Sequence, residues 1–162
     1  MSEKAPVKTN VMRILDKAKV DYRTFEYDHD DGRIDGNTIA EKIGLPEDRV
    51  FKTLVTKGSG GGYFVFVVPV CSELDLKKAA RAAGEKSVSM IPVADINKVT
   101  GYIRGGCSPI GMKKLFPTFF DSSALSLETV TVSAGKIGAQ IRLDPRVLAD
   151  LCHGQFADIR EM

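Results

Sequence analysis

The stretch Gly101-Tyr102-Ile103-Arg104-Gly105-Gly106-Cys107-Ser108-Pro109-Ile110-Gly111 is the most informative part of this sequence. Its four glycines, one proline and one serine exclude a helix interior or a paired strand. Glycines in such a run let the backbone approach a ligand closely and leave N–H groups free to point at it. Because the flanking residues are large and apolar, we predict a rigid loop that packs on a core and lines a pocket. Two successive tight turns without a function are the alternative.

The composition is that of an ordinary globular protein. The 162 residues are 43% hydrophobic and 27% charged, with a net charge of +2, which predicts one domain over residues 1–162. So small a charge does not favour binding nucleic acid through phosphate contacts alone. Since the N-terminus has no apolar signal segment and no apolar run reaches membrane-spanning length, we expect a cytoplasmic protein without a membrane partner.

The three cysteines, Cys71, Cys107 and Cys152, are widely separated and form no Cys-x-x-Cys pair. An odd, unpatterned set indicates reduced thiols. The only histidines are His29 and His153, and no spacing among these residues suits a metal ion. We therefore expect neither a metal nor a cofactor.

Helix and strand signals alternate irregularly along the chain. Thr9, Asn37, Asp75 and Asp144 are predicted to cap helices. The predicted helices cover residues 10–18, 38–43, 76–83, 94–99 and 145–151. The predicted strands cover residues 22–27, 50–56, 63–68, 87–90, 116–120, 129–132, 140–143 and 155–159. Because several strands follow one another without a helix between them, an α+β (mixed α/β) domain is expected.

Lys52 is the most unusual charged residue in a predicted strand. It lies in Val50-Phe51-Lys52-Thr53-Leu54-Val55, where both faces are otherwise apolar or β-branched. Such a strand is usually buried on both faces, and lysine is rarely buried without a partner. We therefore expect its ammonium to reach a cleft or an anionic partner. The alternative is a lysine that protects an edge strand from aggregation.

Two weaker polar segments follow predicted strands. One is Tyr27-Asp28-His29-Asp30, and the other is the small-residue loop that begins at Ser133 and contains Gly135-Lys136-Ile137-Gly138. Each fits either the polar lining of a site or a simple turn.

Together these pieces resemble the bacterial Cys-tRNA(Pro) deacylases of the YbaK/EbsC type, relatives of the editing domain inserted in prolyl-tRNA synthetase. The resemblance runs over residues 11–160 and implies a single domain with a curved, mainly antiparallel sheet flanked by helices. The segments that carry it are Val50-Phe51-Lys52-Thr53-Leu54, Leu74-Asp75-Leu76-Lys77-Lys78, Gly101-Tyr102 with Gly105-Gly106-Cys107-Ser108-Pro109-Ile110-Gly111, and Phe156-Ala157-Asp158-Ile159.

The resemblance implies an activity that removes wrongly attached cysteine from tRNA(Pro), or from tRNA(Cys), together with prolyl-tRNA synthetase and without DNA. It implies that the substrate's own thiol attacks the ester carbonyl and leaves as a thiolactone, so that the chain needs no Ser-His-Asp or Cys-His pair. A requirement for thiol chemistry also separates cysteine from alanine and serine, which a pocket distinguishes poorly by size.

The same match places Lys52, Tyr27, Gly105 and Ser133 on pocket positions of the family. The predicted catalytic residues are Lys52, Gly105 and Gly106. Lys52 would position the terminal nucleotide or ester oxygens, and amides at residues 105–107 would donate to the oxyanion. A methyl group at Gly105 is expected to obstruct the ester. The predicted substrate-binding residues are Tyr27, Thr53, Cys107, Ser108, Ser133 and Gln140.

Two positions depart from the family pattern. Gln140 stands where the family has an acidic residue, and Ile34 is the nearest apolar substitute for a missing aromatic residue. These departures concern the substrate preference. Separately, three other functions remain open. They are a cysteine hydrolase that uses Cys107 with His29 or His153, an Ala-tRNA(Pro) deacylase that uses water, and a non-catalytic binding module.

Overall fold

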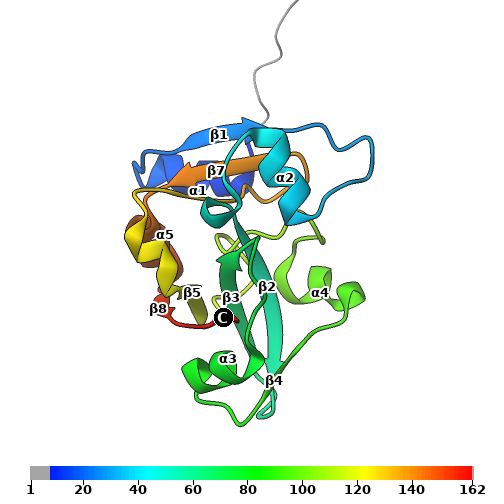
Figure 1. Ribbon diagram of the computed structural model, residues 1–162, viewed down its shortest axis with the longest axis vertical. Coiled ribbons are helices and arrows are strands. Elements are labelled where there is room, and N and C mark those ends of the chain that lie inside the picture. The colour runs from blue at the N-terminus through cyan, green and yellow to red at the C-terminus, as the bar shows by residue number, and fades with distance from the viewer. Residues whose placement is uncertain (1–7, 162) are drawn as a thin grey trace, which may run out of the picture.

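The computed structural model describes residues 8–161, in which five α-helices surround two β-sheets (Figure 1). The helices are α1 (Asn10–Lys17), α2 (Gly36–Ile43), α3 (Leu76–Ala83), α4 (Ile96–Thr100) and α5 (Pro145–Cys152). The strands are β1 (Arg23–Glu26), β2 (Phe51–Gly58), β3 (Tyr63–Pro69), β4 (Val88–Met90), β5 (Thr118–Asp121), β6 (Val130–Ser133), β7 (Ala139–Leu143) and β8 (Gln155–Ala157). None of the helices in this part of the chain is long and apolar enough to cross a membrane.

The strands form a three-stranded sheet in the order β1-β7-β6 and a five-stranded sheet in the order β4-β2-β3-β5-β8. Strand β5 pairs in parallel with β3 and β8, and the remaining pairs are antiparallel. The predicted mixed, mainly antiparallel α+β fold is confirmed. The strands nevertheless form two sheets where one was expected, joined by a parallel bridge between Val50 and Thr131.

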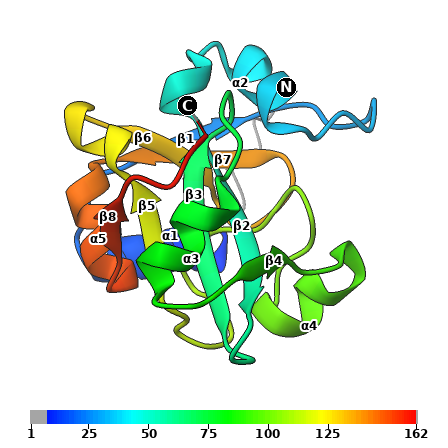
Figure 2. The ribbon, with the colours of Figure 1, turned by 60° about the horizontal axis from the view of Figure 1, so that its bottom comes forward.

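Strand β3 connects the two main layers of the core. Val65 and Val67 belong to the cluster that α1, α5 and the three-stranded sheet complete. Phe66 and Val68 point to the opposite face and pack against α3, which lies across β3 in Figure 2. Because side chains alternate along a strand, an unbroken apolar run fills both layers at once.

Most helix ends follow from local capping chemistry. Thr9, Asp75 and Asp144 cap α1, α3 and α5 with their side-chain oxygens, as predicted. The cap predicted for α2 is wrong, because Asp35 and not Asn37 accepts a hydrogen bond from the amide of Thr38. Residues 36 and 37 therefore lie inside the first turn of α2.

Candidate functional site

A cavity of about 450 Å³ opens beside strand β2, where that strand changes neighbours. Strand β3 pairs along one edge of β2. On the other edge, Val50 bridges Thr131 of β6, and β4 pairs only with residues 56–58. Beyond the hydrogen bond from the Ile91 amide to the Val55 carbonyl, the described chain leaves this edge unpaired over residues 51–54, which line the cavity. Lys52 therefore lies in a locally unpaired stretch of β2 that faces the cavity.

Five parts of the chain build the other walls: the loop before α2 with the start of that helix, the residue after β3, the segment from β4 to α4, the glycine loop, and the facing ends of β6 and β7. The lining residues outside β2 are Ile34, Asp35, Gly36, Ile39, Val70, Met90, Ile91, Val93, Ile96, Arg104, Gly105, Cys107, Ser133 and Gln140. Most are apolar, with a few polar groups among them, as is typical of a small-molecule site.

The structure brings together six of the nine residues predicted for the site. Those that line the cavity are Lys52, Thr53, Gly105, Cys107, Ser133 and Gln140. Tyr27, Gly106 and Ser108 are not among its lining residues.

The Lys52 ammonium has one weak partner. Its Nζ lies 3.5 Å from Oε1 of Glu73, whose side chain is 76% exposed. An exposed ion pair of this kind contributes about 0–1 kcal/mol. Lys52 therefore presents a cation to the cavity that a bound anion or ester oxygen can take over at little cost.

Tyr102 holds the glycine loop in place. Its hydroxyl donates to the carbonyl of Ile110 at 2.5 Å, and its amide donates to the hydroxyl of Thr100 at 3.0 Å. A Cβ at Gly111 would lie 2.9 Å from the Tyr102 hydroxyl oxygen. The loop is thus packed around one aromatic ring, as the sequence predicted for a rigid loop on a core.

The loop amides differ in their availability. The Gly106 amide donates to the carbonyl of Ile103 at 2.9 Å, which closes a tight turn. It is therefore not free to bind an oxyanion, contrary to our expectation. The amides of Gly105 and Cys107 donate to no oxygen within residues 8–161, and both residues line the cavity.

Ser108 and Tyr27 are buried away from the lining. Ser108 is fully buried, and its hydroxyl oxygen accepts from the amide of Ile110, so it supports the loop. Tyr27 lies beside His29, and its buried hydroxyl has no hydrogen-bond partner in the described chain.

Two buried oxygens that belong to lining residues also lack partners among residues 8–161: Oγ1 of Thr53 and Oε1 of Gln140. Gln140 lies directly opposite Ser133 in the β6–β7 pair and is only 4% exposed. Buried polar atoms are nearly always hydrogen-bonded. Unpaired acceptors at a cavity wall suit a ligand that brings N–H or O–H donors.

Cys107 is not activated as a nucleophile. Burial raises the pKa of its thiol to about 11, although a hydrogen bond with Thr100 opposes this shift. A thiol with this pKa is almost fully protonated near neutral pH. Neither His29 nor His153 lines the cavity. The geometry therefore disfavours a Cys-His hydrolase.

Arg104 is a lining residue that the sequence analysis missed. It has no ion-pair or hydrogen-bond partner in the described chain. The only acidic lining residue, Asp35, already uses its carboxylate to cap α2. The signal was present in the sequence, since Arg104 directly precedes Gly105. Within residues 8–161, no group of three or more His, Cys, Asp or Glu side chains is arranged to hold a metal ion.

Residues 36–151 match the model of the aminoacyl-tRNA editing domain. The chain belongs to this family. This chain is 46% identical over 157 residues to EbsC of Enterococcus faecalis, which is named as a candidate Cys-tRNA(Pro)/Cys-tRNA(Cys) deacylase. That match covers 97% of this chain and 96% of its relative.

Two further relatives extend the comparison. The editing-domain chain is 33% identical over 75 residues, or 46% of its length, to a proline–tRNA ligase of Fervidobacterium nodosum, of which the match covers 13%. The crystal structure of a candidate trans-editing enzyme for prolyl-tRNA synthetase superposes with a TM-score of 0.81. It covers 96% of this chain and 100% of the other, at 24% identity, and this likeness supports the fold.

Proposed function

We propose that this chain, acting as one domain over residues 1–162, removes cysteine wrongly attached to tRNA(Pro), with cysteine on tRNA(Cys) as a related substrate. One observation carries the proposal. In a chain 46% identical to EbsC over nearly its full length, the cavity holds Lys52 and the unengaged amides of Gly105 and Cys107, but no nucleophile paired with a base.

This arrangement suits an aminoacyl ester. The ester is already activated, so the site must orient the attacking atom and stabilise the oxyanion that forms. We assign the oxyanion contacts to the amides of Gly105 and Cys107. Lys52 and Arg104 supply positive charge for the phosphodiester and ester oxygens of the tRNA terminus.

The buried hydrogen-bond acceptors set the orientation of the substrate in the cavity. Oε1 of Gln140 and Oγ1 of Thr53 would accept from the α-ammonium of the amino acid or from a ribose hydroxyl. Gln140 is neutral, so it binds an ammonium by hydrogen bonding alone. We assign the α-ammonium to Gln140, which directs the aminoacyl end toward β6 and β7 and leaves the cations of Lys52 and Arg104 for the nucleotide.

The attacking group in this proposal is the thiol of the substrate. Its sulfur forms a bond to the ester carbonyl carbon, and the bond from that carbon to the ribose oxygen breaks. The thiol proton passes to the departing ribose oxygen, which releases uncharged tRNA and a cysteine thiolactone. Holding the thiol against the carbonyl contributes much of the rate, since effective molarities of intramolecular reactions reach roughly 10⁵–10⁸ M.

We further propose that prolyl-tRNA synthetase acts with the chain to supply tRNA specificity. A chain with a net charge of +2 binds free tRNA only weakly at physiological salt. The match to part of a proline–tRNA ligase supports this partner. The reducing cytoplasm is the compartment that suits the three free cysteines.

Deacylation assays with Cys-, Ala- and Ser-tRNA(Pro), with and without prolyl-tRNA synthetase, test the proposal. We expect rapid loss of cysteine and slow loss of alanine and serine. Preferred release of alanine would indicate the water-using deacylase. Binding of charged tRNA without release of any of the three amino acids would indicate a non-catalytic module.

A further inference from the structure

The loop of residues 28–35, between β1 and α2, forms one wall of the cavity. Ile34 and Asp35 line it. Ile34 packs directly over the glycine loop, since a Cβ at Gly105 would lie 2.7 Å from Cδ1 of Ile34. The position of the Ile34 side chain therefore sets the distance between the loop of residues 28–35 and the glycine loop.

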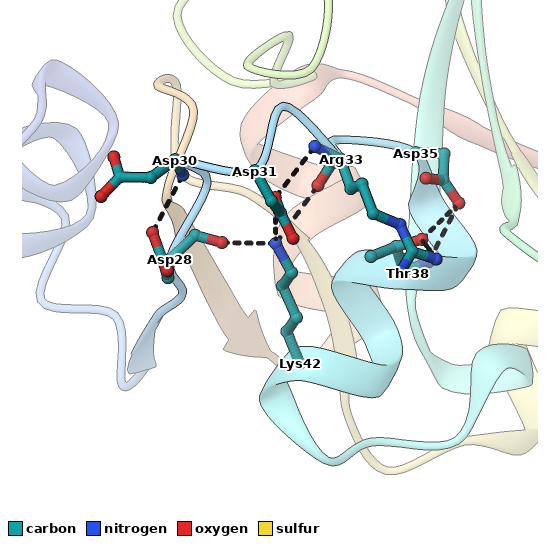
Figure 3. Close-up of polar contacts among 7 residues, drawn as sticks. All are labelled: Asp28, Asp30, Asp31, Arg33, Asp35, Thr38 and Lys42. Atoms are coloured by element: carbon teal, nitrogen blue, oxygen red, sulfur yellow. Dashed lines mark hydrogen bonds and ion pairs between the residues drawn. The ribbon is translucent and has the colours of Figure 1, made fainter.

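Lys42, in the last turn of α2, holds the loop on the N-terminal side of Ile34 (Figure 3). Its ammonium donates to the carbonyl of Asp28 at 2.5 Å, to Oδ1 of Asp31 at 2.9 Å and to the carbonyl of Arg33 at 3.5 Å. A lysine ammonium has three N–H donors, so all three meet oxygens of one loop. The Lys42 side chain is only 20% exposed.

Thr38, one turn earlier on α2, contacts both residues that flank Ile34. Its hydroxyl accepts from Nη2 of Arg33 at 3.2 Å and donates to Oδ2 of Asp35 at 2.9 Å. Residues four apart lie on the same face of a helix. One face of α2 thus fixes the chain on both sides of Ile34.

Charge makes Lys42 the more critical of these two anchors. The loop carries four carboxylates, those of Asp28, Asp30, Asp31 and Asp35, and Arg33 is its only lysine or arginine. The hydrogen bond from Lys42, followed by that from the Arg33 amide, holds the pKa of Asp31 below its usual range. Removing the Lys42 charge leaves neighbouring carboxylates to repel one another, which favours a more open loop.

We propose that Lys42 is a positioning residue for the deacylation, acting through Ile34: it holds the loop of residues 28–35 so that Ile34 closes the cavity against Gly105. This inference rests on the proposed function. Lys42 does not line the cavity itself, so any effect on substrate must pass through the loop.

A double-mutant cycle on the full chain tests this coupling. We expect Lys42→Met to lower kcat/KM for the cysteinyl ester by roughly 10- to 100-fold, because misplacement of about 1 Å can cost that much. In an Ile34→Ala background the same change should cost less than about twofold, since residues that act through one contact are not additive. Lys42→Arg should recover most of the activity.

Lys8→Met is the matched control. Lys8 forms an ion pair with Asp16 on α1 and does not line the cavity, and this change should leave kcat/KM within about twofold. Hydrogen exchange of the Gly32 and Arg33 amides, measured on the free protein, should accelerate in Lys42→Met while core amides of β3 stay protected. This second readout does not depend on activity.

The outcomes separate the inference from the proposed function. Equal losses in the wild-type and Ile34→Ala backgrounds, or unchanged exchange of the loop amides, would overturn the positioning role of Lys42. A wild-type chain that releases no amino acid would instead refute the deacylase proposal. Should Lys42→Met fail to fold, Lys42→Gln removes the same charge and must show the same non-additivity.

Discussion

The backbone of Gly106 lies directly on the peptide that joins Lys136 to Ile137: a Cβ at Gly106 would stand 2.9 Å from the Ile137 amide nitrogen. This contact locks the glycine loop to the loop that joins β6 to β7. Backbone atoms cannot rotate away as a side-chain tip can, so a methyl group must push the two loops apart.

We therefore predict that Gly106→Ala lowers the free energy of unfolding by about 1–3 kcal/mol, as measured by urea denaturation. Gly62→Ala is the control, because a Cβ there finds its nearest neighbour, in Phe64, at 3.9 Å. That change should alter stability by no more than about 0.5 kcal/mol. Equal stability of the two variants would contradict the locking contact.

Gly105→Ala should act differently from Gly106→Ala. The sequence suggested that a methyl group at Gly105 obstructs the ester, but the structure directs it at Ile34. Gly105 also has a φ of +86°, which costs an alanine roughly 1–2 kcal/mol. We expect kcat/KM to fall by at least about tenfold as Ile34 is displaced into the cavity.

A second substitution identifies the cause of that loss. Adding Ile34→Ala to Gly105→Ala should raise the deacylation rate above that of Gly105→Ala alone, because the displaced side chain is removed. In the wild-type background Ile34→Ala should lower the rate. A double variant that is slower than Gly105→Ala would show that the methyl group blocks the ester directly.

The sequence predicted what depends on neighbours close in the chain. Asp75 and Gly84 delimit α3 as expected, because a cap and a left-handed C-terminal glycine are local features. The N-cap of α2 was misassigned because Asp35 and Asn37 are both good caps, and the choice depends on the side chain of Thr38.

Long-range contacts account for what the sequence did not predict. The described strands form two sheets that only the bridge between Val50 and Thr131 joins, and no local pattern encodes this arrangement. The apolar context of Lys52 predicted a cleft. The engagement of the Gly106 amide and the Ser108 hydroxyl inside their own loop depends on backbone turns that composition does not specify.

Lys52→Ala should separate function from stability. Since the pair with Glu73 is weak, we expect the melting temperature to fall by no more than about 3 °C. Loss of the positioning cation should reduce kcat/KM by roughly 100-fold. Lys57→Ala, at an exposed position of the same strand, is the control and should remain active. Normal turnover by Lys52→Ala would remove Lys52 from the mechanism.

Stability should decline at alkaline pH. Burial raises the pKa of Cys107 from 9.0 to about 11 and that of Cys152 from 9.0 to about 12. Above pH 9 the unfolded chain loses these protons while the folded chain keeps them, so the free energy of unfolding falls as pH rises. Each thiol contributes at most about 1.4 kcal/mol per pH unit.

Urea denaturation at a series of pH values between about 7 and 10.5 measures how the free energy of unfolding depends on pH. Cys107→Ala should flatten the decline above pH 9, whereas substitution of the exposed Cys71 should not. An identical alkaline decline in both variants would show that the Cys107 thiol ionises as readily in the folded chain as in the unfolded one.

The origin of the attacking thiol can be decided with one protein variant and one change of substrate. If the substrate's sulfur attacks, Cys107 is a small residue in the wall of the cavity, and Cys107→Ala should keep most of its deacylation rate. Replacing the attached cysteine with serine on the same tRNA should cut the rate severely, since a hydroxyl is far less nucleophilic than a thiol. An inactive Cys107→Ala variant, together with equal release of serine and cysteine, would instead make Cys107 the nucleophile.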